Sequence, residues 1–468
     1  MTRRAIVLIG TEKTGTTTLQ NFLVRNRRLL IERGFVYPGF CGDGNHTGLA
    51  AYALDPVKSD DIRIPFGYGG PADLSSMRER LRDAGRAELV GRDETAIFCS
   101  EHCHSRLNVP LEIATLHTLL AEFFDDIQIA VYLRRQDQVA LSLHSTQLKS
   151  GAVHSEILPR TDAQDIYFNH DRMLAMWAAE FGIENLHPRI FDRAALIGGS
   201  IVTDFCAAWE IGAINDFKHV ADFNGSISAV AQGFLRYANH HLKTADMTED
   251  QRLRGMLAAR LESLFSGQGA QPSRAAAWAF YAQFRPANEM VRRAWFPHLP
   301  RLFDENFASY PEREDPTTLT VEDATRVAVQ LHVATMTELR RLEAEIALRD
   351  GRLQWLAKRP DEAVAALQRA RYLRPDHPDI LRTLAEYLFH TARFSEASHV
   401  AQAAAESRPD SAEYWHFLGL ALRRAGDPAA AARAQQKVLE ITPGDAAAQH
   451  ELELVAALHP QSHPVAML

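Results

Sequence analysis

The chain has 468 residues, a length that predicts two or more domains and a large hydrophobic core. Hydrophobic residues make up 46% of it and charged residues 24%, which is ordinary for a soluble globular protein. The formal charge of −8 and the pI near 6.2 argue against a general binder of nucleic acid or of acidic membranes, and leave room only for a local basic pocket.

Cysteine content and the first residues bear on the compartment. Four cysteines are too few for a disulfide framework in a chain of this length. The first apolar strand starts within five residues of Met1, which leaves no room for a signal peptide. No apolar run approaches the roughly 18 residues needed to span a bilayer. We therefore expect no membrane span and a reducing, cytoplasmic compartment.

Short apolar runs alternate with helical patterns through the first half of the chain. Residues 5–10 (AIVLIG) are continuously apolar, as expected for a strand buried on both faces of a parallel sheet. Further strands are predicted at 95–100, at 127–134 and, more weakly, at 186–192, with helices at 15–33, 136–150, 170–182 and 201–212. This alternation predicts a doubly wound α/β domain with ligand sites at the carboxyl ends of its strands.

Residues 226–345 are predicted to be mostly helical, apart from the loop 297–316, which is rich in proline and charge. That loop predicts the end of the first domain. We therefore assign residues 1–315 to the α/β domain and residues 316–344 to a helical linker.

A fixed period marks the end of the chain. Three prolines and three alanines recur at intervals of 34 residues: Pro375, Pro409 and Pro443, and Ala363, Ala397 and Ala431. This period, with small alanines and a closing proline, resembles the tetratricopeptide repeat, whose paired helices cross closely at alanine. The resemblance implies an all-α repeat domain over 345–460. Its first unit is degenerate, because Asp350 stands where later units have Leu384 and Leu418. The alternative is an ordinary helical bundle.

The first strand runs into a loop that is close to a phosphate-binding loop. Gly10 and Gly15 have the spacing of the pattern G-x-x-x-x-G-K-[ST], but the lysine lies inside the loop, at Lys13. A glycine loop followed by a helix presents backbone N–H groups to an anion. The hydroxyls of Thr14, Thr16, Thr17 and Thr18 can add hydrogen bonds.

A displaced lysine suits the transfer of a sulfuryl group, which carries less charge than a phosphoryl group and has less need of a metal. One ammonium can then stabilise charge on the leaving phosphate oxygen. The loop GTEKTGTTTL resembles the 5′-phosphosulfate loop of sulfotransferases that use 3′-phosphoadenosine 5′-phosphosulfate (PAPS). The resemblance implies a P-loop-type parallel sheet with flanking helices, catalysis by Lys13, and a donor held by Lys13, Thr14, Gly15, Thr16, Thr17 and Thr18.

A second motif supports the resemblance. The 3′-phosphate motif of that family has an arginine at the end of a strand and a serine eight residues later on the next helix; Arg134 and Ser142 have this spacing. Arginine offers a charge-assisted fork to a phosphate, and the serine adds a hydroxyl. The R-K-G motif of cytosolic members is absent from this sequence. Segments 223–239 and 291–307 resemble a bacterial branch, and Arg292, Arg293 and Arg301 are candidates to complete the site.

The family implies a general base that takes the proton of the acceptor hydroxyl. Glu101 and His102 follow the predicted strand 95–100, near where cytosolic members carry a catalytic histidine. His46 lies where glycan-modifying relatives often carry a glutamate base. We expect Glu101 or His46 in this role, with His102 as the third candidate.

A metal site is the alternative for this part of the sequence, because Cys99, His102, Cys103 and His104 cluster there. Zinc ligands usually come as spaced pairs in loops, whereas strand alternation would turn Cys99 into the core. A buried cysteine more often acts as a small apolar residue. We expect no metal.

The sequence thus predicts a sulfotransferase of the carbohydrate type, with PAPS as co-substrate, 3′,5′-ADP as product and no metal requirement. The acceptor is a hydroxyl compound, expected to be a glycan. The repeats are expected to bind a protein partner or to mediate self-association. Two alternatives are a kinase-like P-loop phosphotransferase using ATP and magnesium, and an inactive scaffold whose repeats carry the function.

Overall fold

The computed structural model describes residues 2–58, 60–218, 226–242, 247–315 and 318–457. It divides into two compact units, Met1–Val327 and Ala328–Leu468. Parts of the predicted segments therefore lie outside the described residues: 223–225, 316–317 and 458–460. Nowhere in the described chain is there a helix both long and apolar enough to cross a membrane.

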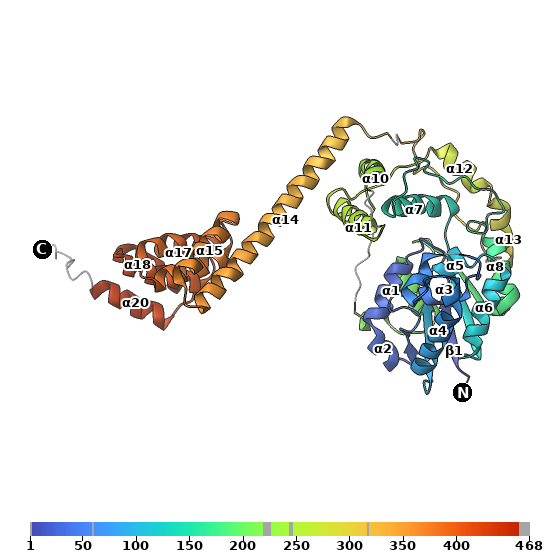
Figure 1. Ribbon diagram of the computed structural model, residues 1–468, viewed down its shortest axis with the longest axis horizontal. Coiled ribbons are helices and arrows are strands. Elements are labelled where there is room, and N and C mark those ends of the chain that lie inside the picture. Colours follow the sequence, from blue (N-terminus) through green and yellow to red (C-terminus); the bar gives the residue numbers. More distant parts are fainter. Residues whose placement is uncertain (1, 59, 219–225, 243–246, 316–317, 458–468) are drawn as a thin grey trace. The chain divides into compact units, whose positions relative to one another are not determined.

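The first unit is built on a parallel sheet with flanking helices, as predicted, and the sheet has five strands where four were expected (Figure 1). Its strands are β1 (Arg4–Leu8), β2 (Phe35–Val36), β3 (Thr95–Cys99), β4 (Asp126–Leu133) and β5 (Leu186–Ile190). Their order is β2-β3-β1-β4-β5, and every neighbouring pair is parallel. The sequence analysis missed β2, which is only two residues long. Strand β1 lies at the centre, where the order reverses, and such a reversal opens a crevice at the strand carboxyl ends.

The continuous apolar run of β1 is explained by burial on both faces. Residues Ile6 and Leu8 pack into one cluster with helices on one side of the sheet, whereas Val7 and Ile9 pack into a second cluster on the other. All four side chains are at most 1% exposed. Since successive side chains point to opposite faces, a strand covered on both sides has no polar position.

Thirteen α-helices of the first unit lie within its described residues: α1 (Thr16–Arg25), α2 (Arg27–Glu32), α3 (Thr47–Ala53), α4 (Leu74–Leu89), α5 (His102–Arg106), α6 (Pro110–Ala121), α7 (Gln136–Lys149), α8 (His170–Phe181), α9 (Ile201–Ala208), α10 (Ala229–His241), α11 (Met247–Leu264), α12 (Arg274–Ala282) and α13 (Arg285–Trp295). Short 3-10 turns occur at Asp61–Phe66, Pro71–Asp73, Ile183–Asn185, Ile197–Gly199 and Ile214–Asp216. The predicted helix 15–33 is two helices, α1 and α2, separated at Asn26. The Asn26 side chain makes hydrogen bonds with the backbone N–H and carbonyl groups of Lys218.

The predicted loop 297–316 is tied back to the start of α7 by a buried ion pair. Arg135 makes two hydrogen bonds to Asp137, at 2.8 and 2.9 Å, and donates to the carbonyl oxygens of Asp304 and Asn306. Tyr310 donates its hydroxyl to Asp137. Asp137 is fully buried, so these partners replace the water that its carboxylate has lost.

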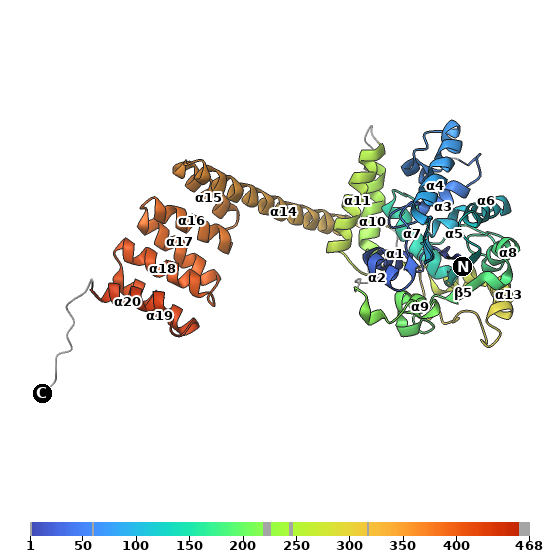
Figure 2. The same ribbon diagram turned by 90° about the horizontal axis from the view of Figure 1, so that it is seen from below.

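The second unit is all helical, and the predicted tetratricopeptide pattern is confirmed (Figure 2). Its helices are α14 (Val321–Leu356), which begins in the first unit, α15 (Pro360–Leu373), α16 (Pro378–His390), α17 (Phe394–Ser407), α18 (Ala412–Ala425), α19 (Pro428–Ile441) and α20 (Ala446–Ala457). The recurring alanines, Ala363, Ala397 and Ala431, are fully buried. Alanine at these positions lets neighbouring helices approach closely. Residues 321–344 of the predicted linker are part of the long helix α14.

Candidate functional site

A cavity of about 1150 Å³ is lined by residues that follow the carboxyl ends of β1, β3, β4 and β5. Its walls bring together most of the predicted site residues: Lys13, Gly15, Thr16, Thr17, Thr18, Glu101, His102, Arg134 and Ser142. They come from three separate segments of the chain, and residues 191–201, after β5, complete the walls. Of the residues predicted for the loop, the 3′-phosphate motif and the general base, Thr14 and His46 do not line it.

The loop between β1 and α1 forms one wall. Gly15 has a φ of 77° and ends the loop, and a β-carbon there would lie 3.2 Å from Ile201 and 3.3 Å from Phe191. Glycine is therefore required by both backbone conformation and space. The N–H groups of the first turn of α1 have no intrahelical partners, and their dipoles favour an anion at this end of the cavity.

Lys13 and Arg134 are held together within the cavity. The Lys13 ammonium donates to Thr146 Oγ1 at 2.7 Å, and the Lys13 carbonyl accepts from Arg134 Nη1 at 2.6 Å. Burial lowers the pKa of Lys13, while the charges of Glu12 and Glu101 oppose that shift. The two cations thus line one cavity at the carboxyl ends of the strands, where a single polyanion could contact both.

The Arg134 guanidinium is further oriented by Gln138, whose Oε1 accepts from Nε at 3.2 Å, and by the Phe191 ring, 5.5 Å away. Burial lowers the pKa of Arg134. Ser142 lines the same cavity two turns into α7. It also lines an adjoining cavity of about 510 Å³, which shares Arg134, Gln138 and Thr146.

Glu101 and His102 lie at the end of β3 and face the same cavity. Glu101 accepts a hydrogen bond from Gln20 Nε2 at 2.7 Å, which orients one carboxylate oxygen. His102 Nδ1 is shielded from solvent without a hydrogen-bond partner among the described residues. Of the predicted bases, these two are the ones that line the cavity.

His46 is placed elsewhere, which corrects the expectation for this residue. It is fully buried, its Nδ1 accepts from the Cys99 backbone N–H at 3.0 Å, and its Nε2 donates to the Pro38 carbonyl at 2.7 Å. Burial lowers its pKa to about 4. Both ring nitrogens are engaged in joining the segment after β2 to β3, so His46 has a structural role.

Thr14 is the second correction. Its side chain is fully buried and donates to the Thr11 carbonyl at 2.6 Å. The hydroxyl therefore stabilises the turn of the loop from inside, and does not reach the cavity.

The three arginines suggested for the 3′ phosphate are also placed away from the cavity. Arg292 and Arg293 both pair with Glu289 at 2.7 Å, and Arg301 lies 3.7 Å from Glu305. None of the three lines either cavity. They are ion-paired residues on and beyond α13.

Glu12 also lines the cavity, although it was not among the predicted site residues. Its carboxylate accepts from the Tyr167 hydroxyl at 2.6 Å. Burial raises the pKa of Glu12, but hydrogen bonds from Tyr167 and Ser105 outweigh it and lower the pKa overall. The sequence held one signal for Glu12, its position next to Lys13. A carboxylate inside an anion-binding loop repels the anion, so its presence there indicates a function.

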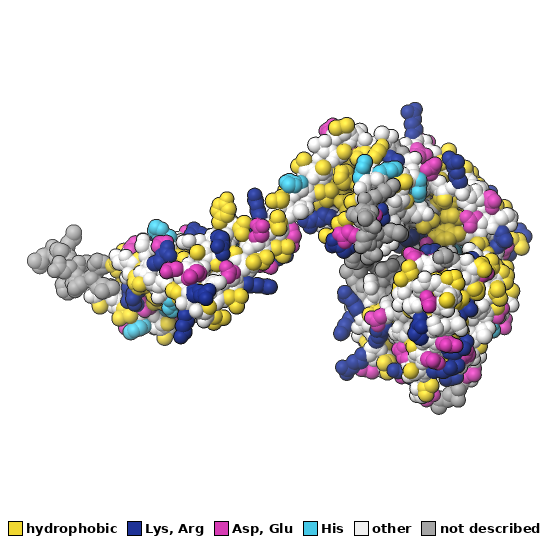
Figure 3. Space-filling view, in the orientation of Figure 1, with side chains coloured by type: hydrophobic (Ala, Val, Ile, Leu, Met, Phe, Trp, Pro, Cys, Tyr) yellow, Lys and Arg dark blue, Asp and Glu magenta, His cyan; other side chains and the backbone are white. Residues whose placement is uncertain are grey.

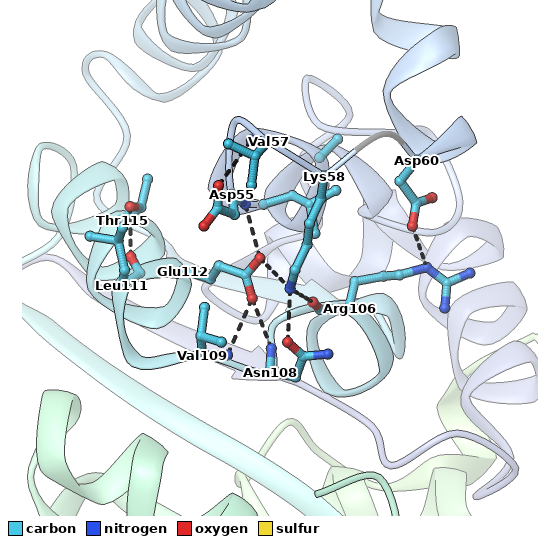
Figure 4. Close-up of polar contacts among 12 residues, drawn as sticks. Asp55, Val57, Lys58, Asp60, Arg106, Asn108, Val109, Leu111, Glu112 and Thr115 are labelled. Atoms are coloured by element: carbon cyan, nitrogen blue, oxygen red, sulfur yellow. Dashed lines mark hydrogen bonds and ion pairs between the residues drawn. The ribbon is translucent and has the colours of Figure 1, made fainter.

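Arg106 is a further missed cation of the cavity. It lies at the end of α5 and pairs with Asp60 at 3.0 Å (Figure 4). The adjoining chain is fixed by the buried Glu112, which accepts backbone N–H groups of Asp55 and Asn108 at 2.9 Å. Lys58 lies 2.7 Å from the same carboxylate. This network holds the segment around Asp60 against α5.

The cysteines do not assemble a metal site. Among the described residues, no group of three or more histidine, cysteine or acidic side chains is arranged to hold a metal ion. All four cysteines are free and buried, and burial raises the pKa of Cys99 and Cys41 well above the usual range.

Comparison with known proteins identifies the second unit only. Two tetratricopeptide repeat models match residues 354–420 and 412–445. A search of curated proteins found no match. Similar solved structures are the Arabidopsis OM64 tetratricopeptide domain (15% identity, 25% of this chain, 98% of that chain, TM-score 0.24), the Sgt2 domain from Aspergillus fumigatus (22%, 27%, 88%, 0.23) and the first such domain of human RPAP3 (19%, 25%, 91%, 0.23).

Proposed function

We propose that the first unit is a PAPS-dependent sulfotransferase that modifies a hydroxyl group, with a carbohydrate or glycoconjugate as acceptor. The observation that carries the proposal is the convergence of two separate sequence motifs, the Lys13 loop and the Arg134–Ser142 pair, on one cavity. Lys13 and Arg134 are directly hydrogen-bonded there although they are 121 residues apart. The proposed fold is the P-loop-type sheet of that family.

The donor would occupy the cavity with its 5′ phosphosulfate at the loop and its 3′ phosphate toward Ser142. Backbone N–H groups after Gly15 and the side chains of Thr16, Thr17 and Thr18 would contact the phosphosulfate. Arg134 would give a charge-assisted fork to phosphate oxygens. PAPS carries phosphate groups at two ends, and the cavity has cations from four segments: Lys13, Arg106, Arg134 and Arg193.

The reaction is a direct, in-line transfer. The acceptor oxygen attacks the sulfur, the bond from sulfur to the bridging phosphate oxygen breaks, and 3′,5′-ADP leaves. Glu101 takes the acceptor proton as general base. Lys13 exchanges its hydrogen bond to Thr146 for one to the departing phosphate oxygen, where negative charge develops. Glu12, fixed by Tyr167, faces the same space and can orient the acceptor.

The second unit consists of tetratricopeptide repeats, which commonly mediate protein–protein interaction through their extended concave surfaces. We propose that it recruits a protein partner or a second copy of the chain.

The decisive experiment incubates the full chain with PAPS and a panel of sugars, lipids, phenols and peptides, and follows the mass of each acceptor. One product heavier by a single sulfuryl group supports the proposal. In parallel, 3′,5′-ADP at about a hundred times its dissociation constant should stabilise the first unit by about 2.7 kcal/mol. An absence of both product and stabilisation would indicate an inactive scaffold.

The kinase-like alternative is tested in the same assays. A phosphotransferase would add a phosphoryl group from ATP and lose activity with EDTA, because magnesium bridges the transferred phosphate in such enzymes. Sulfuryl transfer through Lys13 and Arg134 should persist in EDTA.

A further inference from the structure

The first helix of the repeats has an apolar face that the rest of its unit leaves uncovered. From Leu339 to the end of α14, five large apolar side chains are between 43% and 77% exposed: Leu339, Leu342, Ile346, Leu353 and Leu356. All five lie in the second unit. In Figure 3, hydrophobic side chains are visible along this helix. Isolated exposed leucines are common, but a row of them on one helix marks an interaction surface.

The opposite face of the same helix is packed. Ala344 is fully buried, and a β-carbon at Gly351 would lie 2.8 Å from the Leu367 side chain of α15. In a repeat array each helix pair is covered by the pair before it, and the first pair has no predecessor. Natural arrays place polar residues on that outer face. In this chain the outer face of α14 is apolar, which indicates that another protein surface covers this end of the array.

The spacing of the five residues favours a helix as the covering element. Leu339, Ile346 and Leu353 are seven residues apart, and Leu342 and Leu356 follow the first and third of them by three. This is the a/d pattern of a coiled coil, and Arg349 occupies the remaining d position. Ala344 and Gly351 fall at f, opposite the a/d seam, where α15 packs.

We propose that this face pairs with the same face of a second copy of the chain, with the two α14 helices antiparallel. In that arrangement Leu339 lies opposite Leu356 of the second copy, Ile346 opposite Arg349, and Leu353 opposite Leu342. The pairing is self-complementary and closes after two copies.

Charge selects the antiparallel direction. A parallel pair would place Arg349 against its own counterpart in the seam and Glu345 opposite Asp350 of the second copy, so that like charges meet twice. The antiparallel pair separates the two arginines and brings each Glu345 opposite Arg352 of the second copy. Its like-charge contact is Glu343 opposite Asp350 at the edge of the seam, with no pair of arginines inside it.

The first test measures the mass of the full chain in solution by sedimentation equilibrium. The chain should be a dimer. Leu353→Asp should raise the dissociation constant at least about tenfold, because the carboxylate would be buried opposite Leu342 of the second copy without a partner. The matched control is Val333→Asp on the same helix outside the seam, where the wild-type side chain is 57% exposed; it should remain a dimer. Helical content by circular dichroism confirms that each variant is folded.

The second test fixes the direction by disulfide cross-linking. In the variant Leu342→Cys/Leu353→Cys the two cysteines of one chain are about 16 Å apart along the helix, well beyond disulfide reach. A covalent bond therefore joins two chains, and peptide mass mapping of the dimer fixes its direction. An antiparallel pair joins position 342 to position 353 of the second copy, whereas a parallel pair joins each position to its own counterpart. Ile346→Cys alone should cross-link only in a parallel pair. The native cysteines are all buried and should not interfere.

A monomeric wild-type chain overturns the proposal. A dimer that survives Leu353→Asp overturns it as well, since another surface would then form the contact. Cross-linking of Ile346→Cys overturns the antiparallel arrangement.

Discussion

The two units of this chain are stabilised by contacts of different reach along the sequence. In the first unit, β1 lies between β3 and β4, so that Ile6 is paired with Ile97 and Gln128. Its cavity likewise depends on residues that are more than a hundred positions apart. In the second unit, each helix packs against its neighbours in sequence, through alanines that recur every 34 residues. The first unit therefore depends on a few polar contacts between residues distant in sequence, and the second unit on repeated local packing.

The largest effect on stability is expected where the first unit depends on one buried ion pair. Asp137→Ala leaves Arg135 buried without its carboxylate partner and removes the acceptor of the Tyr310 hydroxyl. Breaking a buried pair in this way costs about 3–5 kcal/mol. Urea unfolding should show the transition of the first unit moving to lower denaturant, while that of the repeats stays in place. A joint shift of both transitions would contradict the independence of the two units.

The next effect concerns turnover. Lys13→Met keeps the length of the side chain but removes the charge, and should reduce turnover about 100- to 1000-fold, or about 2.7–4 kcal/mol. Binding of 3′,5′-ADP, measured by calorimetry, should weaken far less. The control is Thr146→Val, which removes the partner of the ammonium without removing its charge. If Lys13→Met kept normal turnover, the assigned role of Lys13 would be wrong.

These two predictions also indicate what the sequence could and could not provide. Lys13, Arg134 and Ser142 were found because a motif fixes their spacing relative to a strand end. Thr146 was missed because its contact with Lys13 exists only once α7 packs beside the loop. His46 was assigned to the site from its place in the sequence, where related enzymes often carry a glutamate base. Its burial was not predictable, because its hydrogen-bond partner Cys99 lies in a strand 53 residues later. The repeats were predictable because their period repeats the same local contacts.

Acid should destabilise the first unit through His46. Its pKa is lowered by burial from an ordinary value near 6.5 to about 4, because protonated Nδ1 could no longer accept from the Cys99 N–H. Stability from the neutral form is therefore complete above pH 6.5 and is lost as the pH falls toward 4, by up to about 3 kcal/mol. Unfolding by urea at several pH values measures this slope. The variant His46→Gln cannot gain a proton, and its slope should be flatter by that amount.

The smallest effect is expected in the repeats, where many similar contacts share the stability. Ala397 is fully buried between neighbouring helices, and Ala397→Leu adds volume that the close crossing cannot accept. Overpacking of this kind costs about 1–3 kcal/mol. Leucine is also a good helix former, so the loss would come from packing and not from helix propensity. The matched control is Ala429→Leu, at an exposed alanine of α19. For Ala397→Leu alone, the urea midpoint of the repeats should fall, with unchanged 3′,5′-ADP binding. An equal fall in both variants would mean that the close helix crossing at Ala397 does not determine the stability of the repeats.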